Sequence, residues 1–105
     1  MKVLLDACVP RPLRKYLPDH LIQTAQEMMW SQLKNGALLR EAEERFDAFI
    51  TTDQNLKYQQ NVSRRKLAIL VLPTNDWPEI RSKADEIAVE VAKLKPGDFV
   101  ELHWH

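Results

Sequence analysis

The sequence is poor in residues that would crosslink a protein, cradle a phosphate or anchor a membrane. A single cysteine, Cys8, excludes a disulfide within the chain and favours a reducing, cytoplasmic setting. Only two glycines are present, Gly36 and Gly97, so there is no glycine-rich phosphate loop, which argues against a nucleotide-cofactor enzyme. No apolar run approaches the roughly 18–20 residues of a membrane span, and the run after Met1 is too short for a signal peptide. We therefore expect a soluble cytoplasmic protein that makes no membrane contact.

Net charge is absent as well. Fifteen Lys and Arg residues balance fifteen Asp and Glu residues in a chain of 105. No overall field then attracts nucleic acid or a membrane surface, so any such contact must come from local patches. The length fits one domain over residues 1–105, with enough chain for about five strands and helices on both faces of a sheet.

Short apolar runs alternate with amphipathic or polar segments along the whole chain. The pattern predicts strands over 3–5, 21–25, 48–52, 67–72 and 99–102, a helical turn over 26–29, and helices over 10–17, 37–46 and 80–94, the last after a capped start at Asp76. Runs of this kind are typical of buried parallel strands, and strands alternating with helices indicate βαβ units. The sequence therefore predicts a three-layer, Rossmann-like α/β fold with a mostly parallel sheet of about five strands.

An aspartate follows two of the predicted strands. Asp6 comes directly after the first strand, and Asp53 comes directly after the Thr51–Thr52 pair that ends the third. Open α/β sheets bind ligands at the carboxyl ends of their strands, and two converging carboxylates can hold a cation such as Mg²⁺. Such a cation can activate water at a phosphodiester. The alternative is that each aspartate caps a turn or helix, which is a common role after a strand.

Basic and aromatic side chains flank this predicted edge. The candidates for phosphate contacts are Arg11, Arg14, Lys15, Lys34, Lys57, Arg64, Arg65 and Lys66, and those for base stacking are Trp30 and Tyr58. Each of them is also compatible with an ordinary solvated charge or a packing aromatic. Among the remaining polar residues, Cys8 is expected to be a buried structural thiol. We expect Asp76 to be a helix cap and Glu27 a surface residue.

Several segments resemble the small PIN-like domains, free-standing bacterial relatives of VapC-type toxin ribonucleases. The resemblance is carried by residues 1–10, WSQLKNGALL, ITTDQNL and the YQQN that follows, and it spans about residues 1–77. It implies a Rossmann-like PIN fold, an acidic pocket for Mg²⁺ or Mn²⁺, and a nuclease that acts on RNA beside a cognate antitoxin protein. Relatives commonly carry acids where this chain has Ala7, Asn35 and Asn55, and Asn35 also suits a helix N-cap.

Two hypotheses follow. The first is a metal-dependent endoribonuclease of the toxin type, with Asp6 and Asp53 holding the cation and Asn35 and Asn55 as weaker ligands or positioners of water. Its substrate would be RNA, in single-stranded form. The second is a PIN-like nucleic-acid-binding or protein-interaction module that has lost cleavage, which the three neutral residues favour. A homodimer through the short terminal strand is a further expectation.

Overall fold

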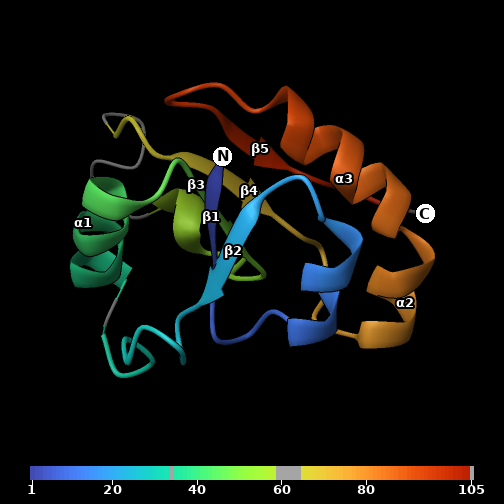
Figure 1. Cartoon of the computed structure of the whole chain (residues 1–105), viewed down its shortest axis with the longest axis horizontal. Helices are drawn as coiled ribbons and strands as arrows, with labels where there is room; N and C mark the ends of the chain where they lie inside the picture. Colours follow the sequence, from blue (N-terminus) through green and yellow to red (C-terminus); the bar gives the residue numbers. More distant parts are fainter. Residues whose placement is uncertain (34, 59–64, 105) are drawn as a thin grey trace.

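Five short strands form one sheet in which every neighbouring pair runs parallel. The computed structural model describes residues 1–33, 35–58 and 65–104. The strands are β1 (Lys2–Leu5), β2 (Leu21–Thr24), β3 (Ala48–Thr51), β4 (Ala68–Val71) and β5 (Phe99–Glu101), in the spatial order β2-β1-β3-β4-β5 (Figure 1). The predicted parallel α/β sheet is confirmed, and each predicted strand is found to within about one residue at either end.

Helices cover both faces of this sheet. Helix α1 (Asn35–Arg45) lies on one face, and the 3₁₀ helix η1 (Arg11–Tyr16), α2 (Trp77–Ser82) and α3 (Ala84–Lys93) lie on the other (Figure 1). Successive strand residues alternate between the two cores, as a pleated strand requires. Leu4 and Phe49 join the α1 core, whereas Leu5 and Ile50 join the opposite one. This double covering makes the central strands apolar on both faces and gives the three layers predicted from the sequence.

The long helix predicted over 80–94 is wrong in one respect, because the structure divides it into α2 and α3. Lys83 lies between them with φ −111° and ψ 11°, outside helical geometry. The Ser82 hydroxyl donates to the Glu79 carbonyl at 2.7 Å, a local bond that competes with the helical pattern and bends it. The predicted start is correct, since the Asp76 side chain accepts the Glu79 amide as a helix cap.

The direction in which the chain adds strands to the sheet reverses between β1 and β3, which are neighbours. The connection that leaves β1 runs to β2 on one side, whereas the connection that leaves β3 runs to β4 on the other, so the two diverge between the neighbouring strands β1 and β3. A crevice forms outside the carboxyl ends of the strands at such a switch point, and this is where doubly wound sheets bind ligands. Asp6 follows β1, and Asp53 lies two residues beyond the end of β3. In the described part of the chain, no helix has the length and apolarity needed to cross a membrane.

Candidate functional site

Asp6 leaves β1 with its backbone and its carboxylate both held. Its amide donates to the Ile50 carbonyl at 2.9 Å, which continues the β1–β3 ladder by one residue. One carboxylate oxygen, Oδ1, accepts the Ala7 amide at 2.8 Å. The other, Oδ2, accepts the Thr51 hydroxyl at 2.7 Å and lies 3.6 Å from the Cys8 sulfur. These contacts give the carboxylate one orientation at the end of the strand.

Thr51 links the two predicted aspartates. Its side chain is fully buried at the end of β3, and the β1–β3 register places it beside Asp6. Its hydroxyl donates to Asp6 Oδ2 and accepts the Asp53 amide at 3.1 Å. The structure therefore brings the Asp6 carboxylate and the backbone of Asp53 to the same hydroxyl group. In the sequence, Thr51 is recognisable as a strand residue and as part of the ITTDQNL resemblance, but this role is not.

The loop after β3 is held by side-chain bonds to backbone. Asp53 Oδ1 accepts the Asn55 amide at 2.9 Å, so this carboxylate also closes a local turn, as the capping alternative predicted. Gln54 Nε2 donates to the Leu72 carbonyl at 2.6 Å, just beyond the end of β4, and to the Thr52 carbonyl at 3.2 Å. Gln54 thus ties the Asp53 loop to the neighbouring strand. Sequence reasoning missed it, because the bond depends on β4 lying alongside β3.

A single helical turn follows β2 on the other side of Asp6. The Thr24 hydroxyl accepts the Glu27 amide at 3.1 Å, and Glu27 Oε1 accepts the Thr24 amide at 2.9 Å, which is the reciprocal pattern of a capping box. The 26–29 turn predicted from the sequence is confirmed. Gln26 Nε2 donates to the Ala7 carbonyl at 3.2 Å and so holds this turn against the Asp6 loop. The sequence pattern T-x-x-E is the signal that could have revealed this capping box.

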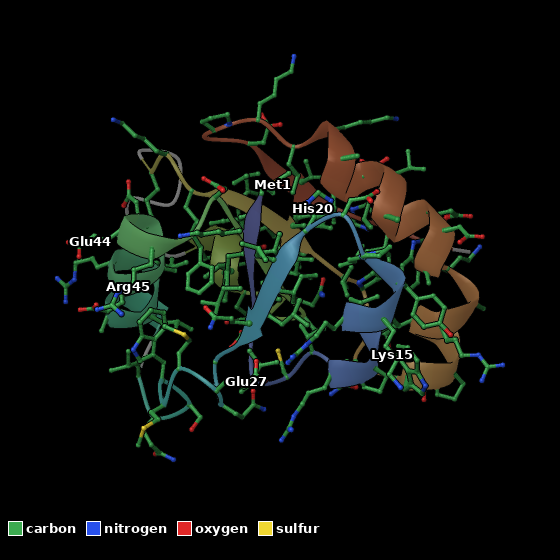
Figure 2. All side chains as sticks on the ribbon, in the orientation of Figure 1. Met1, Lys15, His20, Glu27, Glu44 and Arg45 are labelled. Carbon is green, nitrogen blue, oxygen red and sulfur yellow. The ribbon has the colours of Figure 1, made fainter. Side chains whose placement is uncertain are left out.

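Glu27 is a structural residue as well as a surface one. The Arg14 guanidinium donates to its Oε1 at 2.7 Å, and Figure 2 shows Glu27 beyond the carboxyl end of β2. This hydrogen bond, together with that from the Thr24 amide, lowers the pKa of Glu27 below its ordinary value. Thr24 is on an edge strand. The hydrogen bond from its amide to Glu27 therefore also occupies a backbone donor with which another chain could pair. Arg14, predicted as a phosphate contact, is therefore engaged in an ion pair.

Cys8 does not have the predicted buried position. The thiol is exposed, 3.6 Å from Asp6 Oδ2 and 3.8 Å from the Thr51 hydroxyl. Val9, the next residue, fills the core position instead and is almost completely buried. An apolar residue outcompetes a thiol for the buried place, so the prediction of a buried structural thiol is wrong.

The other predicted phosphate contacts divide into two groups. Arg11 and Lys15 are exposed on η1 and form no ion pair within residues 1–33, 35–58 and 65–104; Figure 2 labels Lys15. Lys57 Nζ lies 3.6 Å from Glu101, and Arg65 donates to Glu43 at 3.0 Å. Lys34 and Arg64 lie outside the described residues.

The aromatic and asparagine candidates also differ from one another. Trp30 packs edge-on against Phe46, with ring centroids 6.1 Å apart, and lies under the Arg45 guanidinium, so it serves the α1 core. Tyr58 is 77% exposed, and the Lys57 ammonium lies over its ring, 5.3 Å from the centroid. Asn55 is exposed beside Asp53. Asn35 is the first residue of α1, and its side chain lies outside the described part.

The side chains at this edge include two of the ligand type that hard divalent cations prefer. Asp6 and Asp53 supply carboxylate oxygens, and Mg²⁺ is commonly held by one or two carboxylates, with water and substrate phosphate completing its shell. No group of three or more His, Cys, Asp or Glu side chains able to hold a metal is found among the described residues. A site with one or two carboxylates does not need such a group. Asp6 and Asp53 are the residues that would hold the ion.

Two cavities of the described part lie away from this edge, near the amino end of the sheet or along β2. One of about 510 Å³ is lined by Lys2, Asp19, Glu43 and Asp47, among others, at the start of β1 and β3. A second, of about 540 Å³, runs along β2 and includes Ile22, Met28 and Phe46. Neither includes Asp6 or Asp53. We assign the candidate site to the carboxyl end, because the polar side chains converge there.

Comparison of the chain with protein-family models, with curated proteins and with solved structures finds no match.

Proposed function

We propose that this protein is a metal-dependent endoribonuclease of the PIN-like class that acts on single-stranded RNA. The observation that carries the proposal is the Thr51 hydroxyl, which binds the Asp6 carboxylate and the Asp53 backbone at the β1–β3 switch point. This is the position at which doubly wound sheets bind ligands, and it carries one acid directly after β1 and another two residues beyond β3. The resemblance of ITTDQNL to PIN-like domains agrees with this reading.

Each residue has a defined task in this proposal. Asp6 and Asp53 hold Mg²⁺ or Mn²⁺, which when bound supplies positive charge at the phosphodiester and lowers the pKa of a water molecule. Thr51 is a positioning residue that fixes the orientation of Asp6 through its 2.7 Å hydrogen bond. Arg11 and Lys15, which form no ion pair within the described ranges, attract the phosphate backbone.

The test compares cleavage of a labelled single-stranded RNA with Mn²⁺ present. We expect the wild type to cut the RNA, and Asp6→Asn and Asp53→Asn each to lose at least about a hundredfold in rate, since removing a charged group from an active site costs several kcal/mol of transition-state stabilisation. Asp47→Asn is the matched control, because Asp47 is also an aspartate beside β1 and β3, but at their amino ends. Equal cleavage by all four proteins would exclude the proposed site.

A second candidate is a module that binds nucleic acid or protein without cutting. It is favoured by Asn35 and Asn55, which replace acids expected from the resemblance, because fewer negative charges weaken divalent binding. The same experiment separates the two candidates. Binding that weakens steeply with salt, with no cleavage in Mn²⁺, would support the module.

The proposal includes a protein partner. A toxin-type ribonuclease requires a cognate antitoxin, and the chain would then arrest growth when expressed alone. Co-expression of the neighbouring gene product should restore growth, and loss of toxicity in Asp6→Asn would link the effect to the site. Light scattering after gel filtration tests the proposed homodimer, for which a mass of 12.3 kDa at all concentrations is the contrary result.

A further inference from the structure

The turn that follows β2 contains a hydrogen-bond acceptor with no donor. Gln26 Oε1 is buried and accepts no hydrogen bond from the described residues. Exchanging the positions of Gln26 Oε1 and Nε2 does not supply the missing donor. Nε2 donates to the Ala7 carbonyl, and an oxygen in its place would be repelled by that carbonyl. A buried acceptor without a donor costs about 1–3 kcal/mol, so a further group is expected to supply the proton.

The same turn ends at a residue unsuited to its backbone conformation. The Trp30 amide donates to the Ala25 carbonyl at 2.8 Å, and the Met29 amide to the Gln26 carbonyl at 3.0 Å, which is the Schellman arrangement at the end of a helical turn. Met29 occupies the left-handed position with φ 62°, where glycine is strongly favoured. Its side chain is nevertheless 88% exposed and makes little packing contribution. A strained, exposed apolar residue of this kind is typical of a contact surface.

The turn adjoins the proposed nuclease site through Ala7. Gln26 Nε2 donates to the carbonyl of Ala7, and the amide of the same residue donates to Asp6 Oδ1, so a single residue links the Gln26 amide group to the carboxylate that would face a scissile phosphate. A phosphate oxygen can only accept hydrogen bonds and cannot satisfy Gln26 Oε1. The nearest donor on an RNA strand is the ribose 2′-hydroxyl next to the phosphate, a group that DNA lacks.

We infer that the 24–30 turn reads the sugar of the substrate, with Gln26 Oε1 accepting the 2′-hydroxyl and Met29 packing on the adjoining nucleotide. The inference rests on the proposed function for its choice of ligand. Gln26 is partly exposed as a residue while its Oε1 is buried, so the inferred contact requires the side chain to turn this oxygen toward the strand. The turn then makes the protein selective for RNA over DNA without reading base sequence.

The test measures binding by fluorescence anisotropy without a divalent ion, using labelled single strands of one sequence as RNA, DNA and 2′-O-methyl RNA. We expect the wild type to prefer RNA, and Gln26→Met to reduce the ratio of RNA to DNA affinity by about five- to tenfold, the worth of one hydrogen bond. The 2′-O-methyl strand, which has no 2′ donor, should behave as DNA does. Gln23→Met is the matched control, because Gln23 is an exposed glutamine on β2, and it should leave the ratio unchanged.

Met29→Gly supplies an independent readout. It should weaken the binding of RNA and DNA to the same extent while raising the melting temperature, a pair of effects that a purely structural role would not produce. An unchanged RNA to DNA ratio in Gln26→Met, or no preference in the wild type, would overturn the inference and leave Gln26 as the partner of a structural water. Cleavage is scored separately: if the wild type binds but never cuts, the proposed nuclease fails while the binding ratio still decides the role of Gln26.

Discussion

An aspartate lies next to β1 and β3 at both ends of the sheet, and the two ends use it differently. At the amino end, Asp47 Oδ2 accepts the Lys2 amide at 2.8 Å, and its backbone amide donates to the Lys2 carbonyl, also at 2.8 Å. At the carboxyl end, Asp6 meets a buried hydroxyl, a thiol and the Asp53 loop. Asp47 therefore binds backbone alone in these contacts, whereas Asp6 binds the Ala7 amide and also the side chains of Thr51 and Cys8.

This difference shows why residue type alone is a poor guide to function. Both aspartates follow or precede a strand, and both accept backbone amides. Only the carboxyl end lies at the switch point, where the connections that leave β1 and β3 diverge and where doubly wound sheets bind ligands. The larger cavities lie near the amino end or along β2, so volume alone also fails to identify the candidate site. The predictions that follow test whether the two ends differ energetically as their contacts suggest.

The largest effect is expected from Thr51→Val. The change keeps the side-chain volume but removes the hydroxyl, leaving Asp6 Oδ2 and the Asp53 amide without their buried partner. We expect the free energy of unfolding to fall by about 2–3 kcal/mol, measured by urea denaturation. Asp47→Asn at the exposed amino end should cost less than about 1 kcal/mol, and equal losses for the two variants would contradict the comparison.

The next effect concerns metal. At Mn²⁺ tenfold above its dissociation constant, the wild type should gain about 1.4 kcal/mol in stability, because the ion binds only the folded state. Asp6→Asn and Asp53→Asn should each lose most of that gain in thermal melts, while Asp47→Asn should keep it. A metal-induced rise in melting temperature that persists in Asp53→Asn would remove this aspartate from the site.

A smaller change of opposite sign is expected from Met29→Gly. Glycine adopts φ 62° without the Cβ clash, so the variant should be more stable than the wild type by about 1 kcal/mol. Met28→Gly is the control, because Met28 packs against the α1 core and should lose stability instead. Urea denaturation measures both. A destabilised Met29→Gly would mean that the exposed side chain contributes to the fold.

The smallest effect is a pH dependence at Glu27. Its pKa is lowered in the folded state by the hydrogen bonds from Arg14 and the Thr24 amide, so the folded protein holds this proton less tightly than the unfolded chain does. The stabilisation is therefore complete above about pH 4.3, the ordinary glutamate pKa, and is lost as pH falls through the lower folded value. Comparing wild type with Glu27→Gln in melts from pH 7 to pH 3 should show a difference that shrinks in acid; a constant difference would argue against the ion pair.

Much of the fold could be predicted because its signals are local. The AILV run is apolar throughout because β4 is buried on both faces, and Asp76 with Glu79 marked the start of α2 correctly. The break at Lys83 was missed because the apolar spacing continues across it. The backbone leaves helical geometry at Lys83, next to Ser82, whose hydroxyl bonds the Glu79 carbonyl. Asp6 and Asp53 could be selected from their position after strands alone.

The rest of the candidate site depends on contacts between distant parts of the chain. Gln54 reaches a carbonyl eighteen residues away, and Gln26 reaches one nineteen residues away. Nothing in the neighbouring sequence distinguishes these glutamines from ordinary loop residues. The exposure of Cys8 was likewise decided by competition with Val9 for one core position.

By itself, the sequence determined the alternation of strands and helices, the apolar character of the central strands and the two acids at strand ends. These follow from side-chain periodicity and local hydrogen bonding, which act over a few residues. Only the tertiary structure decided that Thr51 lies beside Asp6, because a parallel register joins residues 45 positions apart. The physical reason is that strand order and register are set by burial of the whole sheet between two layers of helices, and no single segment contains that information.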